Sequence, residues 1–147
     1  MYKRLLVAFD GSEQSYRALD HAVAMAEKFG SELVLLTVIP TTIGSFFPDD
    51  GFDPKAYTKF QESTNEFYHN ILKDADEKVS MKYPNLNIRT ILMEGRPSVT
   101  IVVVAEKEGC DMIVMGCRGI GGIERWVLGS TSQTVAASCK KAVMIIK

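Results

Sequence analysis

The chain has 147 residues, of which 46% are hydrophobic and 24% are charged, and this balance predicts a single globular domain over residues 1–147. Seventeen Lys and Arg residues against eighteen Asp and Glu residues give a net charge of −1 without a basic run longer than two residues, so nucleic acid is not an expected partner. No apolar run exceeds five residues, which is too short for a membrane helix or a secretory signal, so we expect a cytoplasmic protein without a membrane partner.

The first third of the chain reads as strand, helix, strand. The apolar run Leu5 to Phe9 predicts a strand that is closed by the turn Asp10-Gly11-Ser12. Apolar residues then recur at helical spacing up to Gly30, which we predict to cap the helix at its carboxyl end. Leu33 to Ile39 is apolar at neighbouring positions, which favours a strand covered by helices on both faces.

A long loop and a long helix follow. Residues from Pro40 to Pro54 predict a loop of unusual length, and Asp53 before Pro54 is typical of a helix N-cap followed by a first-turn proline. The predicted helix runs as far as Pro84, and we expect one face of it to be marked by Ala56, Phe60, Phe67, Ile71, Ala75 and Val79. Phe46, Phe47 and Phe52 in the loop could form a lid, a partner contact or a cover over the domain's own core.

The remaining elements complete an alternating pattern. Ile88 to Met93 predicts a third strand. The β-branched stretch Val99 to Ala105 favours a strand by propensity, but we predict a helix because a parallel connection needs a crossover of about a dozen residues. Met112 to Met115 predicts the fourth strand, Gly129 to Ser138 a short helix, and Val143 to Ile146 the fifth strand. The alternation predicts an α/β fold.

The segment from Gly116 to Ser132 is the strongest candidate for a binding site. Its seventeen residues hold five of the eleven glycines, and glycine lets backbone N–H groups approach an anion closely. A helix that opens at Gly129-Ser130 adds N–H donors and the positive end of a dipole. With the hydroxyls of Ser130, Thr131 and Ser132 and the charge of Arg118, the segment predicts a phosphate site.

Two common phosphate motifs do not fit this segment. A Walker loop needs Lys before the Ser or Thr at the helix start, and Leu128-Gly129-Ser130 has none. A dinucleotide fingerprint that starts at Gly119 would need Gly or Ala where Glu124 stands.

The segment does resemble the ATP-binding branch of the universal stress protein family. That family's motif is Gly, any two residues, Gly, any nine, Gly, then Ser or Thr, and Gly116, Gly119, Gly129 and Ser130 match it. The resemblance extends to the stretches Asp111–Met115, Leu5–Ser12 and Leu33–Val38. It covers essentially the whole chain and is least specific from Pro40 to Pro84.

The resemblance implies an open five-stranded parallel sheet of order 3-2-1-4-5 with helices on both faces, a Rossmann-like fold of the adenine nucleotide alpha hydrolase type. The strand order reverses between the first and fourth strands, where ligands bind beyond the carboxyl ends. By the motif, Ala8, Asp10 and Val38 would line the adenine and ribose side, and Met115 and Gly116 would flank the sugar and first phosphate. The phosphates would be held by Arg118, Gly119, Gly129, Ser130, Thr131 and Ser132.

The implied ligand is ATP, with Mg or Mn bound through the phosphates, because the sequence has no evident carboxylate or imidazole cluster to hold an ion. Three positions depart from the family's commonest pattern: Cys117 replaces a usual Ser, Ile120 a frequent basic residue, and Lys140-Lys141-Ala142 a Pro-Cys-Pro-like connection. Cys117 is a candidate reactive thiol in an electropositive loop. Cys110, Cys117 and Cys139 are an odd number without paired spacing, which fits a reducing compartment.

Three functions remain open at this stage. The first is an ATP-binding stress-response protein that senses or carries nucleotide with little or no hydrolysis. The second is a slow ATP hydrolase or phosphotransferase, and the third is an interaction dimer of the same fold without nucleotide. Asp10 could instead form an Asx-turn, and Arg118 could be a solvated loop charge. The resemblance also implies a homodimer through Val143, Met144, Ile145 and Ile146, because this strand would be an apolar edge of the sheet.

Overall fold

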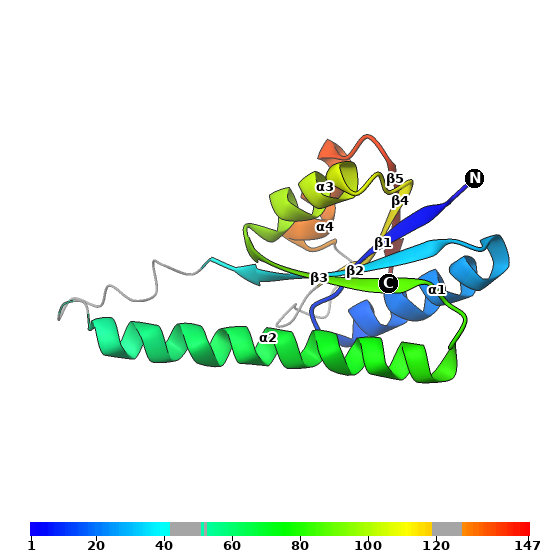
Figure 1. The fold of residues 1–147 in the computed structure, drawn as a ribbon. Helices are drawn as coiled ribbons and strands as arrows, with labels where there is room; N and C mark the ends of the chain where they lie inside the picture. Colours follow the sequence, from blue (N-terminus) through cyan, green and yellow to red (C-terminus); the bar gives the residue numbers. More distant parts are fainter. Residues whose placement is uncertain (42–50, 52, 119–127) are drawn as a thin grey trace.

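The computed structural model describes residues 1–41, 51, 53–118 and 128–147. Within these residues the chain forms one parallel sheet of order β3-β2-β1-β4-β5 with helices on both faces, as predicted (Figure 1). The strands are β1 Arg4–Ala8, β2 Glu32–Pro40, β3 Ile88–Gly95, β4 Met112–Gly116 and β5 Ala142–Ile146. The helices are α1 Glu13–Phe29, α2 Pro54–Lys82, α3 Pro97–Lys107 and α4 Ser130–Ser138.

Each face of the sheet carries its own hydrophobic core. Side chains alternate between faces along a strand, so Leu5 and Val7 of β1 pack with α1 and α2, whereas Leu6 packs with α3 and α4. The seven central residues of β2 are all buried, which confirms that helices cover this strand on both sides.

The capping signals in the sequence are confirmed at two helix ends. Gly30 ends α1 in the left-handed conformation, with φ 67°, a conformation that glycine adopts without steric cost. Asp53 caps α2 by accepting a hydrogen bond from the Lys55 backbone N–H at 3.0 Å, and Pro54 stands in the first turn. The β-branched stretch 99–105 is helical inside α3, so the crossover requirement outweighs strand propensity there.

Several predicted boundaries differ from the structure by one or two residues, and two of these differences lie next to the candidate site. β1 ends at Ala8 and not at Phe9, although the Phe9 N–H still donates to the Leu36 carbonyl at 2.8 Å. α4 begins at Ser130, because Gly129 has extended backbone angles and is the N-cap residue. Both shifts are one residue long and lie where the chain turns out of the sheet.

The predicted apolar face of α2 is buried only in its carboxyl-terminal half. Leu72, Ala75 and Val79 are buried, whereas Phe60 and Phe67 are 40% and 50% exposed. The difference arises because the amino-terminal half of α2 projects past the carboxyl ends of the strands (Figure 1). Most of the preceding loop, residues 42–50 and 52 with its three phenylalanines, lies outside the described residues.

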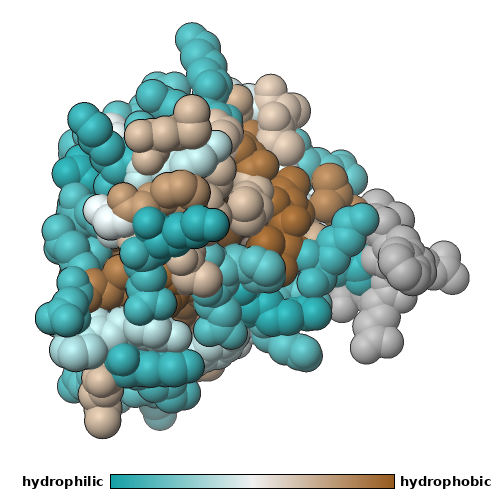
Figure 2. Space-filling view, turned by 90° about the vertical axis from the view of Figure 1, so that its right-hand side faces the viewer, coloured by the Kyte–Doolittle hydropathy of each residue, from teal (hydrophilic) through white to brown (hydrophobic). Residues whose placement is uncertain are grey.

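β5 is an edge strand that pairs with β4 on one side. Val143, Met144, Ile145 and Ile146 are each half-buried, because the core covers one part of each side chain and leaves the rest exposed. Figure 2, which faces the side where both chain ends lie, shows a hydrophobic patch bordered by hydrophilic side chains. No helix in the described part of the chain is long and apolar enough to cross a membrane.

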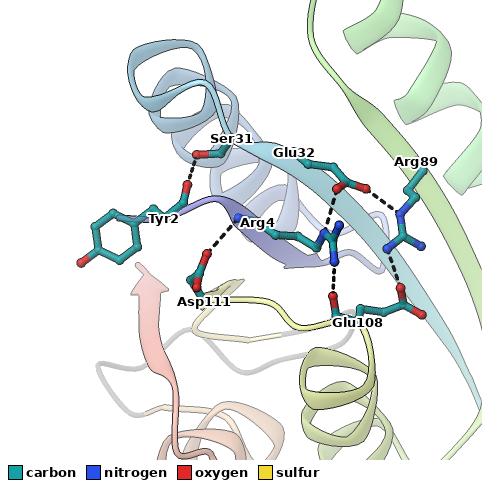
Figure 3. Close-up of polar contacts among 7 residues, drawn as sticks. All are labelled: Tyr2, Arg4, Ser31, Glu32, Arg89, Glu108 and Asp111. Carbon is teal, nitrogen blue, oxygen red and sulfur yellow. Dashed lines mark hydrogen bonds and ion pairs between the residues drawn. The ribbon is translucent and has the colours of Figure 1, made fainter.

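Ion pairs tie the elements together at the amino-terminal edge of the sheet (Figure 3). Glu32 on β2 accepts from Arg4 of β1 and Arg89 of β3, each at 2.7 Å, and Arg89 also pairs with Glu108 at the end of α3, at 2.5 Å. The Arg4 guanidinium donates to the Glu108 carbonyl. The hydrogen bond from Arg89 is the largest factor that lowers the pKa of Glu32. This edge is opposite to the one that carries the candidate site.

Candidate functional site

The candidate site lies at the carboxyl ends of β1 and β4. These strands are neighbours, with Ala8 of β1 in register with Met115 of β4. From β1 the chain continues into α1 on one face of the sheet, and from β4 it continues into α4 on the other face. The chain therefore leaves two adjacent strands in opposite directions, which is the arrangement in which open α/β sheets form a ligand crevice.

Three of the residues that we predicted to contact the adenine or the sugar lie together. Ala8, Val38 and Met115 come from three different strands, and all belong to the hydrophobic cluster on the face of α3 and α4. The buried Thr37 hydroxyl donates to the Phe9 carbonyl at 2.8 Å, which fixes the end of β1 against β2. The result is an apolar surface next to the end of the central strand.

Asp10 follows that surface directly. Its Oδ1 accepts the Ser12 backbone N–H at 2.9 Å, so the alternative of an Asx-turn describes part of its role. This bond orients the carboxylate at the start of α1, where Ser12 is the N-cap and its hydroxyl oxygen accepts from the Ser15 N–H at 3.2 Å. Asp10 is half-buried, and it lies just beyond the carboxyl end of β1, at the candidate site.

Gly116 is a glycine for a reason that the motif does not reveal. A Cβ atom at this position would lie 2.7 Å from the Gln14 Cβ and 3.0 Å from the Gln14 carbonyl carbon. The first turn of α1 therefore packs directly on the backbone at the end of β4. Gln14 was missed by the sequence analysis, and a glycine at the end of a fully buried strand was the only available signal.

The start of α4 is tied to the end of β4 through one carbonyl group. The Cys117 carbonyl accepts the Gly129 N–H at 2.7 Å and the Ser132 hydroxyl at 2.9 Å. A Cβ atom on Gly129 would lie 3.0 Å from the same oxygen, so the close approach of the two backbones requires glycine. Ser132 is 1% exposed, and its hydroxyl also contacts the Gly129 carbonyl at 2.9 Å. Its side chain therefore joins the residue that follows β4 to the start of α4.

The amino terminus of α4 carries no side-chain cap. Because this helix connects β4 to β5, its first turn lies at the carboxyl edge of the sheet. The first-turn N–H groups of a helix have no intrahelical acceptor and carry a partial positive charge, so they attract anions. Ser130 is exposed and Thr131 half-buried, which leaves both hydroxyls at the surface of this turn. Arg118 is half-buried next to Cys117, and Gly119 and Ile120 lie outside the described residues.

Tyr68 of α2 is a second residue that the sequence analysis missed. Burial, together with a smaller effect of the Asp10 carboxylate, raises the pKa of Tyr68. The sequence did offer a signal for this residue. Tyr68 stands three residues before Ile71, so it lies on the same face of α2, the one that turns toward the sheet. Among the residues that the structure describes, no group of three or more His, Cys, Asp or Glu side chains could hold a metal ion.

The sequence model of the Universal stress protein family matches residues 1–147, and the chain belongs to that family. It is 31% identical to Universal stress protein MJ0531 of Methanocaldococcus jannaschii over 147 residues, covering 100% of this chain and 83% of that protein. It is 33% identical to Universal stress protein YxiE of Bacillus subtilis over 150 residues, covering 100% of both chains.

Solved structures share the fold. Universal stress protein UspA from Lactobacillus plantarum superimposes with a TM-score of 0.83 at 24% identity, covering 99% of this chain and 98% of that one. A universal stress protein crystallised in complex with cAMP superimposes with a TM-score of 0.69 at 26% identity, covering 99% of this chain and 96% of that one.

Proposed function

We propose that this protein binds ATP in the crevice at the carboxyl ends of β1 and β4, and that it senses or carries the nucleotide in a stress response with little or no hydrolysis. The observation that carries the proposal is the uncapped amino terminus of α4, held at this edge by the Cys117 carbonyl. Its N–H groups and the hydroxyls beside them suit a phosphate chain. The relative in complex with cAMP supports an adenine nucleotide as the ligand.

The residues divide into three roles in this proposal. Ala8, Val38 and Met115 offer apolar contact for the adenine, and Asp10 offers an acceptor for the sugar. Gly116, Arg118, Gly119, Gly129, Ser130 and Thr131 surround the sugar and phosphates, and an Mg or Mn ion would bind through the phosphates. Ser132 acts as a positioning residue, because its hydroxyl is already bonded to the Cys117 carbonyl.

A hydrolase or phosphotransferase is the weaker alternative. Phosphoryl transfer needs a charged group that stabilises the transition state and a group that orients the nucleophile. In the described parts of the segment, 116–118 and 128–132, Arg118 is the one charged residue. On the proposed function, a single-turnover assay with ATP should show no phosphate release beyond the slow background rate, whereas rapid release would favour the enzyme.

A negative charge introduced at the start of α4 tests the proposal that ATP binds there. Ser130→Asp adds a carboxylate where the helix dipole favours it, so the fold should be preserved, but the carboxylate repels phosphate. We expect calorimetry to show ATP affinity reduced by at least about tenfold. The control is Thr134→Asp, an exposed position one turn further along the same helix, which should change the affinity by less than about twofold. Equal affinities of the two variants would refute the assignment, as would a purified protein that neither releases nor binds adenine nucleotide.

We also propose a homodimer through β5. The strand offers a row of apolar side chains and a backbone edge that is open within the described residues, and antiparallel pairing with a second copy satisfies that edge symmetrically. Sedimentation should show a dimer at micromolar concentration for the wild type and a monomer for Ile145→Lys. The matched control is Val103→Lys, which places the same charge at an exposed valine of α3. A monomeric wild type, or dimers in both variants, would refute this interface.

A further inference from the structure

We propose that Tyr68 of α2 forms the wall of the site at its sugar end and that its hydroxyl, together with the Asp10 carboxylate, selects nucleotides with an intact ribose. This inference rests on the proposed function and assigns to the same site a residue and a selectivity beyond it. It is argued from the position of α2, from the surroundings of Tyr68, and from the hydrogen-bonding groups that a ribose presents.

The position of α2 is fixed by its contact with the turn after β1. Gly11 has φ 84°, and a Cβ atom there would lie 3.1 Å from the Ile71 Cδ1. The helix therefore crosses directly over the residue that follows Asp10. Tyr68 lies three residues before Ile71, so the two side chains share one face of the helix.

The direction of α2 places Tyr68 on the side of the ligand. The helix leaves the carboxyl end of β2 and returns to the amino end of β3, so its earlier residues lie further toward the carboxyl edge of the sheet. Tyr68 is therefore about one turn further out than Ile71, beside Asp10 and beyond the end of β1. The projecting half of α2 continues past it (Figure 1).

The side chain of Tyr68 carries a phenol group in a partly covered position. Its ring packs edge-on against the Phe67 ring, with centroids 5.2 Å apart, and the residue is half-buried. Burial, with a smaller effect of the Asp10 carboxylate, raises the pKa of Tyr68. A phenol group that can donate a hydrogen bond thus lies within electrostatic range of a carboxylate that can accept one.

A ribose presents hydroxyl groups that both donate and accept, which suits this pair. A site that hydrogen-bonds a substrate hydroxyl rejects the analogue that lacks it, because its own polar groups then lose their partner. We therefore expect ATP to bind about tenfold more tightly than at least one of 2′-deoxyATP and 3′-deoxyATP.

The experiment measures the affinities of ATP and both deoxy analogues by calorimetry for the wild type, Tyr68→Phe and Tyr57→Phe. Tyr68→Phe keeps the ring and removes the hydroxyl, so it should weaken ATP and reduce the preference over the deoxy analogue to within about twofold. Tyr57→Phe removes a phenol on the same helix whose oxygen accepts from Gln61 at 2.9 Å, and it should keep the wild-type preference.

The possible outcomes distinguish a failure of this inference from a failure of the proposed function. A wild type that binds all three nucleotides equally, or a Tyr68→Phe variant that keeps the preference, overturns this inference and leaves nucleotide binding intact. A Tyr68→Phe variant that weakens all three ligands alike assigns the residue a structural role and also overturns the inference. A wild type that binds none of the three refutes the proposed function itself.

Discussion

Gly116→Ala should destabilise the protein even when no nucleotide is present. The added methyl group would lie 2.7 Å from the Gln14 Cβ, 3.0 Å from the Gln14 carbonyl carbon and 3.2 Å from its oxygen, whereas carbon atoms in contact normally lie about 3.5–4.0 Å apart. The first turn of α1 would have to move by roughly 1 Å. Overpacking of this kind costs about 1–3 kcal/mol, and with an unfolding entropy of about 0.3 kcal/mol/K the Tm should fall by about 3–10 °C.

Urea denaturation of the nucleotide-free protein at one fixed concentration measures this cost. If the glycine served only to admit a ligand, Gly116→Ala would unfold at the wild-type urea midpoint, and the packing argument would be refuted. A double-mutant cycle with Gln14→Gly gives a second check. That change removes the closest contact and leaves the two backbone contacts, so it should recover about 1 kcal/mol of the loss without restoring the full stability.

Three further predictions concern stability and reactivity. Glu32 has a lowered pKa in the folded protein, so its ion pairs stabilise the fold above its unfolded pKa near 4.5, and this stabilisation is lost as the pH falls through the folded pKa. Glu32→Gln should therefore lower the free energy of unfolding by about 1 kcal/mol at pH 7 and flatten the acid limb of a stability–pH curve. Burial raises the pKa of the Cys110 thiol to about 11. Iodoacetamide at pH 8 should therefore label Cys117, which is partly exposed, and should label Cys110 only after unfolding. Peptide mass spectrometry measures both labelling reactions. Gly30→Ala should cost about 1 kcal/mol through its φ of 67°, since no atom lies within 4 Å of the added carbon, and Gly30→Asn should cost less in the same denaturation assay.

The features that the sequence predicted best depend on neighbouring residues, on the family resemblance or on the topology of a parallel sheet. The caps at Gly30 and Asp53 were predictable because capping depends on the residue itself and on a few residues beside it. The strand order followed from the family resemblance and is confirmed by the pairing of β1 with both β2 and β4. The helix at 97–107 was predictable from topology against local propensity.

The contacts that sequence did not predict join segments far apart in the chain. Gln14 lies against Gly116, and Ile71 lies against Gly11, next to Asp10, only because α1 and α2 cross the sheet at particular positions. Residue spacing defines the face of a helix but not how far the helix extends beyond the sheet. For the same reason, only Ile71, Ala75 and Val79 of the predicted apolar face of α2 pack on the core, and the exposure of Phe60 and Phe67 was not foreseen. The site residues themselves stay predictions until nucleotide binding is measured.

The projection of α2 past the sheet divides one continuous helix into two regions of different local stability. Its 29 residues span about 43 Å, but Leu72, Ala75 and Val79, the buried residues of the helix, all lie in the second half. Amide hydrogens around them should exchange with solvent only when the whole domain unfolds, whereas those nearer Asp53 can exchange through local opening. Local opening of the first half of α2 would therefore leave intact the core that the second half covers.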